Sequence, residues 1–267
     1  MSEEIPTQTS PEKFANAAQI LRDSKHVICL TGAGLSVESG IRPFRGPGGL
    51  WTEHGEPPMD GYQRFLRDPA SVWRERMQPE GPMKAFSETL LRARPNGAHL
   101  ALVELEQMEV LRCLITQNVD NLHRAAGQQN VLEIHGNATL LRCIDCLERR
   151  PRATVQIDLD HLPPRCQTCG GIIKSDTVEF GEPIPRDVLE ACMQQGEQAD
   201  CCIVAGTSAT VYPAAQIPLD VLSRGGHLIE VNLYPTEITH QCVVSLRGPA
   251  APTLARLTED VRGHLKA

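Results

Sequence analysis

Short apolar runs rich in β-branched residues alternate along the chain with longer segments whose apolar positions recur at helical spacing. Buried strands are predicted at His26–Leu30, Leu111–Thr116, Val131–Ile134, Cys201–Ala205 and His227–Asn232. Helices are predicted at Pro11–Asp23, Gly97–Met108, Arg186–Gln194 and Ala214–Arg224. Strands and helices that alternate in this order indicate an α/β fold, with a parallel sheet covered by helices.

Two segments interrupt this alternation. The segment Pro43–Pro58 has repeated Gly and Pro around Trp51, which is typical of a long functional loop. The segment Cys143–Cys169 has paired cysteines and several prolines, but little apolar pattern. We therefore predict one Rossmann-like domain with a smaller domain inserted into it. The Rossmann-like domain comprises residues 1–45, 96–138 and 177–267, the loop and helical part of the small domain residues 46–95, and a cysteine-containing module residues 139–176.

Composition narrows the possible partners. The 267 residues are 41% hydrophobic and 22% charged, values typical of a globular protein, and the net charge of −7 provides no basic field for nucleic acid. The stretch Met1–Phe14 is polar and acidic, which argues against a secretion signal. The longest apolar runs are too short to span a bilayer. We therefore expect a cytoplasmic protein that binds neither nucleic acid nor membrane; a monomer is compatible with the sequence, which does not determine the oligomeric state.

The ten cysteines include two Cys-x-x-Cys pairs, Cys143/Cys146 and Cys166/Cys169, separated by about twenty residues. Four thiolates from two such turns can close a tetrahedral shell around Zn²⁺, with no position left for water or substrate. A pair of buried thiols or a redox couple is the alternative. The spacing favours a structural zinc site, and the module at 139–176 is then a zinc-binding module whose folding depends on the metal.

A Gly32-Ala33-Gly34 turn follows the first predicted strand. Small residues at such a junction let backbone N–H groups approach a pyrophosphate. The dinucleotide-binding pattern is incomplete, because Val37 stands where its third glycine is required. An ordinary tight turn explains the short motif nearly as well, so the longer segment that follows has to decide between the two.

That longer segment, Gly32–Gly46, resembles the equivalent segment of the sirtuins, the NAD-dependent protein deacylases. The resemblance extends from about residue 12 to about residue 260. Further motifs follow in the order found in the family: Thr116–His123, His135-Gly136, the four cysteines, Val178–Glu182, Gly206–Ser208 and Val231–Leu233. One departure concerns a proline, since sirtuins usually have Gly-Ile-Pro-x-Phe-Arg and this chain has Gly-Ile-Arg-Pro-Phe-Arg over residues 40–45.

The resemblance implies that NAD binds in a cleft between the two domains and is consumed as a co-substrate. It assigns to NAD the residues Gly32, Ala33, Gly34, Ser36, Phe44, Arg45, Gln117, Asn118, Val119, Asp120, Gly206, Thr207, Ser208, Asn232, Leu233 and Ala250. Among them, Asn118 and Asp120 would lie in the nicotinamide pocket, Asn232 at the adenosine ribose and Ala250 near the adenine. The alternative for Asn118 and Asp120 is that they cap a helix at Asn121–Ala126.

His135 is one of nine histidines, and a lone histidine is more often structural than catalytic. It directly follows a predicted strand, however, and an imidazole that titrates near neutrality can take a proton from a ribose hydroxyl. In the sirtuin mechanism the acyl oxygen attacks the nicotinamide ribose carbon and expels nicotinamide, and a histidine then activates a ribose hydroxyl. The resemblance therefore identifies His135 as the catalytic base.

The segment Val178–Glu182 resembles the one with which sirtuins bind their acyl-lysine peptide or protein as an added strand. Val178, Phe180 and Gly181 are the candidate substrate-binding residues; the alternative is an edge strand of the core. Sirtuins that prefer acidic acyl groups carry Tyr-x-x-Arg after the cofactor loop, and the equivalent stretch, Val72–Pro79, contains no tyrosine. We therefore expect acetyl or a longer apolar acyl group.

The predicted activity is removal of acyl groups from lysine, with nicotinamide, O-acyl-ADP-ribose and free lysine as products. One alternative is a protein ADP-ribosyltransferase or NAD hydrolase of the same fold. The other is a non-catalytic NAD-binding module, against which the joint presence of His135, Asn118 and Asp120 argues.

Overall fold

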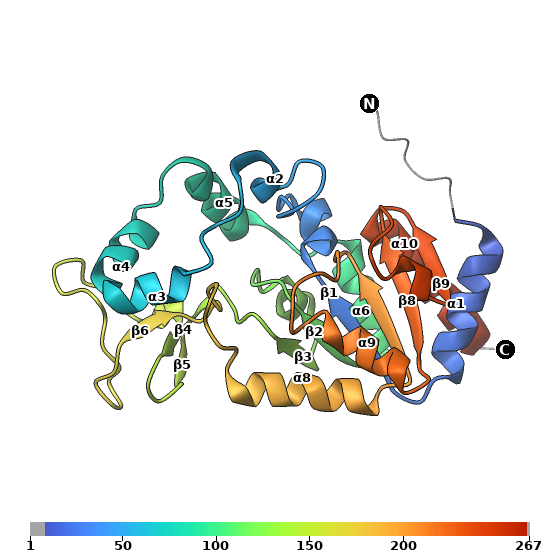
Figure 1. Cartoon of the computed structure of the whole chain (residues 1–267). Coiled ribbons are helices and arrows are strands. Elements are labelled where there is room, and N and C mark those ends of the chain that lie inside the picture. Colours follow the sequence, from blue (N-terminus) through green and yellow to red (C-terminus); the bar gives the residue numbers. More distant parts are fainter. Residues whose placement is uncertain (1–8, 266–267) are drawn as a thin grey trace.

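The computed structural model describes residues 9–265, and its largest element is a six-stranded parallel sheet (Figure 1). The strands run in the order β3-β2-β1-β7-β8-β9, and every neighbouring pair is parallel. Their bounds are β1 (Val27–Thr31), β2 (Leu111–Thr116), β3 (Val131–Glu133), β7 (Cys201–Ala205), β8 (His227–Asn232) and β9 (Val244–Arg247). The strand order changes direction at β1. In open α/β sheets the ligand crevice lies outside the carboxyl ends of the strands at such a point.

Helices cover both faces of this sheet. On one face pack α1 (Pro11–Asp23), α6 (Gly97–Gln107) and α10 (Ala250–Leu265), and on the other α8 (Arg186–Gln198) and α9 (Gln216–Ser223). In β1, Val27 and Cys29 belong to the first core, whereas Ile28 and Leu30 belong to the second. Because side chains alternate between faces and both faces are buried, such a strand forms a continuous apolar run in the sequence.

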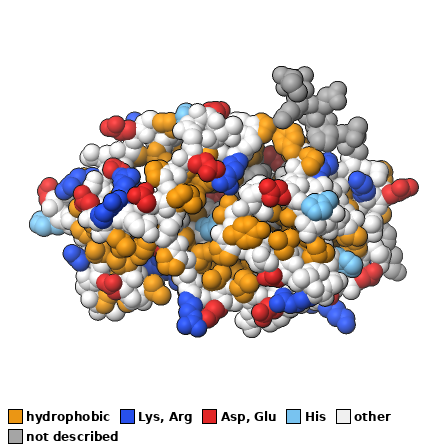
Figure 2. Space-filling view, in the orientation of Figure 1, with side chains coloured by type: hydrophobic (Ala, Val, Ile, Leu, Met, Phe, Trp, Pro, Cys, Tyr) orange, Lys and Arg blue, Asp and Glu red, His pale blue; other side chains and the backbone are white. Residues whose placement is uncertain are grey.

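The smaller part lies at one end of the molecule (Figure 1). It contains an antiparallel sheet with the order β5-β4-β6 and four helices: β4 (Leu140–Cys143), β5 (Arg149–Pro151), β6 (Ile173–Ser175), α2 (Leu50–His54), α3 (Gly61–Arg67), α4 (Pro69–Met77) and α5 (Gly81–Arg92). Its core includes Phe65 and Trp73, and the Trp73 indole N–H donates to the Ile173 carbonyl at 2.8 Å. Hydrophobic side chains gather in the middle of the face shown in Figure 2.

The predicted α/β fold, with a parallel sheet and a smaller added part, is confirmed. The five predicted strands and four predicted helices are all present, with small shifts at their ends. Not predicted were the strands β4, β5, β6 and β9, the helix α10 and the short helix α2, which lies inside the segment expected to be a loop. Three short 3-10 helices, η1 (Ala33–Ser39), η2 (Arg152–Thr154) and η3 (Thr239–Gln241), were also not predicted. The domain boundaries stay predictions.

Within residues 9–265, no helix is long and apolar enough to cross a membrane. The expected cytoplasmic location stays a prediction.

Two imidazoles are buried near the start of α6, where α7 (Leu122–Ala126) packs against it. His99 is 0% exposed, and its ring centroid lies 4.8 Å from that of His123. The His99 Nδ1 atom accepts a hydrogen bond from the Asn96 N–H at 3.2 Å, within the capping box of α6. Burial lowers the pKa of His99 to about 4, and burial also lowers the pKa of His123 well below 6.5. Both rings are therefore neutral in the folded protein at neutral pH.

We expect that replacing His99 with glutamine makes the fold less sensitive to acid. In the wild type, the unfolded chain binds a proton at His99 below about pH 6.5, whereas the folded protein does so only near pH 4. The free energy of unfolding therefore falls as the pH decreases through this window. A glutamine at the third helical position can keep the capping hydrogen bond but does not titrate. Urea unfolding at two pH values measures the effect: His99→Gln should lose about 2 kcal/mol less stability than the wild type between about pH 7 and pH 5. Equal losses in the two proteins would contradict the assignment.

Candidate active site

Two turns, one after β1 and one after β7, are in backbone contact at the carboxyl edge of the sheet. The Gly34 N–H donates to the Gly206 carbonyl at 2.7 Å. A Cβ added at Gly34 would lie 2.8 Å from that same oxygen, and one added at Gly32 would lie 2.7 Å from the Thr207 Cβ. The glycines of the first turn are therefore required by close approach, because any side chain would force the two turns apart. The expected turn also continues into a helix, since Ala33 begins η1.

A hydrogen-bonded group of side chains joins the ends of β1 and β2. Asn118 Nδ2 donates to the Gly32 carbonyl at 3.0 Å and to Ser36 Oγ at 3.1 Å. Ser36 Oγ in turn donates to Asp120 Oδ2 at 2.6 Å. The other oxygen of Asp120 accepts from the Leu122 N–H at 2.9 Å, at the start of α7. One oxygen of Asp120 therefore bonds the first N–H of α7, whose N-cap residue is Asn121 and makes no side-chain capping bond, while the second oxygen belongs to the group around Ser36.

His135 follows β3 and is half-buried. Its Nδ1 lies 3.2 Å from the Gln117 carbonyl oxygen. Because a carbonyl can only accept, Nδ1 carries the proton and Nε2 is left with a free lone pair. Burial lowers the pKa of His135 below 6.5, and the bond to Gln117 offsets part of that effect. The ring is thus neutral at physiological pH, which is the state that a general base needs.

Further predicted residues form hydrogen bonds along the same edge of the sheet, towards β8. Gln117 Nε2 donates to Thr207 Oγ1 at 2.9 Å, and Asn232 Nδ2 donates to the Thr207 carbonyl at 2.8 Å. The Asn232 Oδ1 atom accepts from the Leu233 N–H at 3.1 Å. Gln117, Thr207 and Asn232 are therefore linked across the ends of β2, β7 and β8.

Other predicted residues lie at this edge without joining that chain of bonds. The Val119 carbonyl accepts from the Ala138 N–H at 2.8 Å. Ser208 is exposed and its hydroxyl lies 2.9 Å from that of Thr210. Ala250 is buried at the first position of α10.

Phe44 and Arg45 are not brought to the sheet edge by any hydrogen bond or ring contact of the described residues. The Phe44 ring lies 4.7 Å from that of Trp51 and 5.8 Å from that of Phe86. The Arg45 guanidinium stacks 4.8 Å over Trp51 and pairs with Glu56 at 3.0 Å. Both side chains are therefore held by contacts within the segment that carries α2 and α5.

The segment Val178–Glu182 lies in the loop between β6 and α8 and belongs to neither sheet, so the alternative of an edge strand is wrong. The Val178 N–H donates to the His135 carbonyl at 2.8 Å, and the Phe180 carbonyl accepts from the Tyr62 N–H at 3.0 Å. Gly181 has a φ of +77°, and a Cβ there would lie 2.7 Å from Gln63 Oε1. The segment is thus fixed between the His135 turn and α3.

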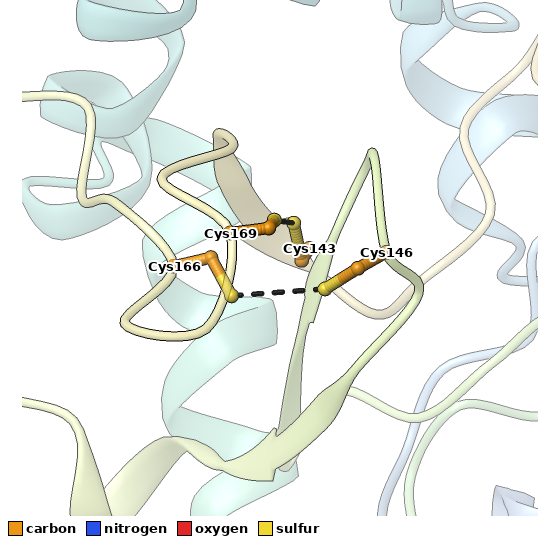
Figure 3. A group of neighbouring side chains, drawn as sticks. All are labelled: Cys143, Cys146, Cys166 and Cys169. Atoms are coloured by element: carbon orange, nitrogen blue, oxygen red, sulfur yellow. Dashed lines mark hydrogen bonds between the residues drawn. The ribbon is translucent and has the colours of Figure 1, made fainter.

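The four predicted metal ligands converge at one point in the smaller part (Figure 3). The sulfurs of Cys143, Cys146, Cys166 and Cys169 all lie within 4.8 Å of one another. The Cys143–Cys169 and Cys146–Cys166 sulfur distances are 3.5 Å and 3.7 Å. A tetrahedral zinc with Zn–S bonds of about 2.3 Å requires sulfurs about 3.8 Å apart, so the cluster is compatible with a structural zinc ion. No other potential metal-binding cluster occurs among residues 9–265.

A layer of polar side chains next to the site was not predicted from the sequence. Thr31 Oγ1 donates to Thr116 Oγ1 at 2.9 Å and lies 3.0 Å from His123 Nε2. All three residues are buried. Threonine at the end of an apolar strand gives little signal, because its side chain also fits a strand well. His123 stands inside the motif that was identified, but only the fold shows its contact with Thr31.

Residues 32–213 match the model of the Sir2 family. The chain belongs to the Sir2 family. Proteins similar to it along nearly their whole length include NAD-dependent protein deacylase 2 of Pyrobaculum aerophilum, which is 40% identical over 94% of this chain and 97% of that protein. The NAD-dependent protein deacylase of Pyrococcus abyssi is 42% identical over 95% of this chain and 100% of that protein.

Solved structures of Sir2 proteins share this fold. The crystal structure of a Sir2 homologue in complex with NAD has a TM-score of 0.80 and 41% identity, and the match covers 97% of this chain and 96% of that one. A Sir2 complex with a p53 peptide and NAD⁺ has a TM-score of 0.76 and 31% identity, and the match covers 96% of this chain and 100% of that one.

Proposed function

We propose that this Sir2 protein is an NAD-dependent protein-lysine deacylase that releases nicotinamide, O-acyl-ADP-ribose and free lysine. One observation supports the proposal above all others. His135 follows β3, Asn118 and Asp120 follow β2, and Ser36 follows β1. These three strands are neighbours and parallel, so a neutral imidazole and the Asn118–Ser36–Asp120 group share one edge of the sheet.

NAD would bind along this edge, from the end of β2 to the end of β8. The turns around Gly32, Ala33, Gly34 and Gly206 leave no large side chain in the way of a pyrophosphate. The N–H groups of the three glycines donate to backbone carbonyls, whereas the Ala33 N–H makes no backbone hydrogen bond in the described part of the chain and is left for a phosphate oxygen. Thr207 and Ser208 would assist there, while Asn232, Leu233 and Ala250 would contact the adenosine half.

At the nicotinamide end, Asn118 and Asp120 would bind the carboxamide, with Ser36, Gln117 and Val119 around them. Phe44 and Arg45 would have to leave their contacts with Trp51 to cover the cofactor, a change of the kind that closing loops make on binding.

Bound NAD supplies the ribose carbon at which the acyl oxygen bonds and the nicotinamide that leaves. The protein supplies a base. With Nδ1 donating to the Gln117 carbonyl, the Nε2 lone pair of His135 can take the proton of a ribose hydroxyl, and burial keeps the ring unprotonated for this task.

The acyl-lysine chain would lie along Val178, Phe180 and Gly181. In the described part of the chain, the Val178 C=O and the Phe180 N–H make no hydrogen bond. These are the groups that a peptide can pair with when it is added as a strand. Because the Val178 N–H is bonded to the His135 carbonyl, a peptide bound there lies next to the proposed base.

The acyl group that we propose is removed from lysine is acetyl or a longer apolar group. In the stretch Val72–Pro79, Arg74 is exposed, and Arg76 pairs with Glu179 at 2.5 Å. Because the Arg76 guanidinium is already paired, it would bind an acidic acyl group less well than an unpaired guanidinium would.

The deciding experiment incubates the purified protein with NAD and a panel of acyl-lysine peptides, and identifies the products by mass. We expect nicotinamide and deacylated peptide in a one-to-one ratio, together with O-acyl-ADP-ribose. Nicotinamide formed equally well without peptide would indicate an NAD hydrolase, and ADP-ribosylated protein would indicate a transferase. NAD binding without any nicotinamide release would indicate a non-catalytic module.

A further inference from the structure

Lys174 in β6 is a fully buried lysine, with 0% of its surface exposed. Its ammonium has three donors, and all three are used. They go to the Glu182 carboxylate at 2.9 Å, to the Ser175 carbonyl at 2.9 Å and to the Thr177 carbonyl at 2.7 Å. Burying an ammonium group costs free energy unless the group is paired and hydrogen-bonded, and here both conditions are met. It fixes the chain between β6 and the segment that follows.

Glu182 is the partner of two buried cations. Its carboxylate is 5% exposed, and its Oε1 accepts from Arg142 Nη2 at 2.7 Å, while the Arg142 side chain is itself 3% exposed. Arg142 and Lys174 sit opposite each other on the paired strands β4 and β6. Glu182 is therefore anchored to the antiparallel sheet of the smaller part by two charges.

Glu182 bonds both backbone groups of Glu179, one through its carboxylate and the other through its backbone N–H. The Glu179 N–H donates to Glu182 Oε2 at 2.9 Å, and the Glu182 N–H donates to the Glu179 carbonyl at 3.0 Å. Glu179 is thus closed to any further strand. The Val178 C=O and the Phe180 N–H make no hydrogen bond in the described part of the chain, so these two groups, on either side of Glu179, are the ones left for a partner.

The chain directly after Lys174 also contacts the turn that follows the proposed base His135. Asp176 lies two residues after Lys174, and its Oδ2 accepts from the Asn137 N–H at 3.2 Å. Gly136 has a φ of +76°, and a Cβ there would lie 2.1 Å from the Asp176 carbonyl oxygen. The chain after β6 is therefore packed directly against the turn that follows His135.

We propose that Lys174, Arg142 and Glu182 form a positioning lock, which holds the segment Val178–Gly181 with one edge blocked and the other presented to the acyl-lysine peptide. This inference rests on the proposed deacylase function for its substrate. None of the three is among the residues proposed to bind NAD or to act on the reacting atoms. They act by keeping the peptide-binding edge in place before the substrate arrives, which lowers the ordering cost of binding.

Glu182→Gln tests the lock in the full-length protein. The amide keeps the shape but loses the charge, so we expect the KM for an acyl-lysine peptide to rise about tenfold or more. The KM for NAD should stay within about twofold of the wild-type value. Glu190→Gln is the matched control, because Glu190 forms an exposed ion pair with Arg186 at 2.6 Å on α8. It should leave both constants unchanged.

A double variant separates positioning from stability, because Glu182→Gln alone leaves Lys174 as an uncompensated buried charge and can prevent folding. Lys174→Met with Glu182→Gln removes one charge of each sign and conserves volume, and Arg142 keeps its ion pair with Asp176 at 3.3 Å, so the fold should survive. We expect this variant to melt within a few degrees of the wild type and still show the raised peptide KM. A folded double variant whose peptide KM lies within about twofold of the wild type would overturn the proposal.

Hydrogen exchange at the Glu179 amide gives a readout that needs no catalysis. In the wild type this N–H is bonded to a buried carboxylate, and in the folded double variant it should exchange about tenfold faster or more. Unchanged exchange would overturn the lock even if the enzyme is active. Faster exchange together with an inactive wild type would sustain the lock and sink the deacylase proposal instead.

Discussion

His135→Ala should abolish peptide deacylation while the protein still binds NAD. General-base catalysis by a positioned side chain contributes roughly 10²- to 10⁴-fold, so a fall of kcat in this range is expected. The imidazole donates only to the Gln117 carbonyl, and its loss breaks no ion pair and leaves no buried charge. A steady-state assay with an acetyl-lysine peptide measures kcat, and isothermal titration measures NAD binding.

The pH profile of the wild type sharpens this test. The base works only when it is neutral, and burial lowers the pKa of His135 below 6.5. The value of kcat should therefore be flat through neutral pH and fall only in more acidic solution. His240→Ala is a suitable control, because His240 lies in η3 and outside the proposed site. A His135→Ala enzyme with kcat within tenfold of the wild type would exclude His135 as the base.

The sheet could be predicted because each of its buried strands has a recognisable apolar pattern in the sequence. Val27 to Thr31 and Cys201 to Ala205 are buried on both faces, so each appears as an unbroken apolar run that ends in a turn. The zinc cluster could be predicted for another reason, since two Cys-x-x-Cys turns already bring their ligands together locally. Edge strand β9 is short and half-exposed, and this weakened its pattern.

The hydrogen bonds of Asp120 could not be predicted from the motif that contains it. The capping and ligand-binding interpretations used the same carboxylate, and nothing in the sequence separates its two oxygens. The fold assigns Oδ1 to the Leu122 N–H and Oδ2 to Ser36 Oγ. Ser36 is 84 residues away in the chain, so this pairing arises only when β1 and β2 lie side by side.

Lys174 is the clearest case of a role without a sequence signal. A single lysine in a short strand is ordinarily taken as a solvent-facing residue, because lysine is almost never fully buried unless it is paired. Its partner Glu182 was noted only as the end of the substrate motif, and Arg142 lies on a different strand. The three meet only after β4 and β6 have paired.

Removal of the zinc ion should unfold the smaller part and leave the large sheet intact. Cys143 and Cys166 are buried in the same apolar core as Trp73, and without the metal four close thiols would remain beside that core with nothing to hold them together. Binding of structural zinc by small domains is worth about 10–16 kcal/mol near pH 7, and this energy is lost on chelation. Trp73 reports the change, because it is 1% exposed and donates to the Ile173 carbonyl of β6. Its fluorescence should shift to the red when a strong chelator is added.

Matched variants make this prediction specific. A Trp51→Phe background leaves Trp73 as the single tryptophan, since the chain contains two. In that background Cys143→Ser should lose its zinc and show the red-shifted emission without chelator. Cys242→Ser, which alters a half-buried cysteine outside the cluster, should keep both zinc and the native emission. Because β6 leads directly into the segment Val178–Glu182, peptide deacylation should be lost with the metal, while the helical circular dichroism of α1, α6, α8 and α10 persists. Native emission after complete loss of zinc would mean that the module folds on its apolar contacts alone.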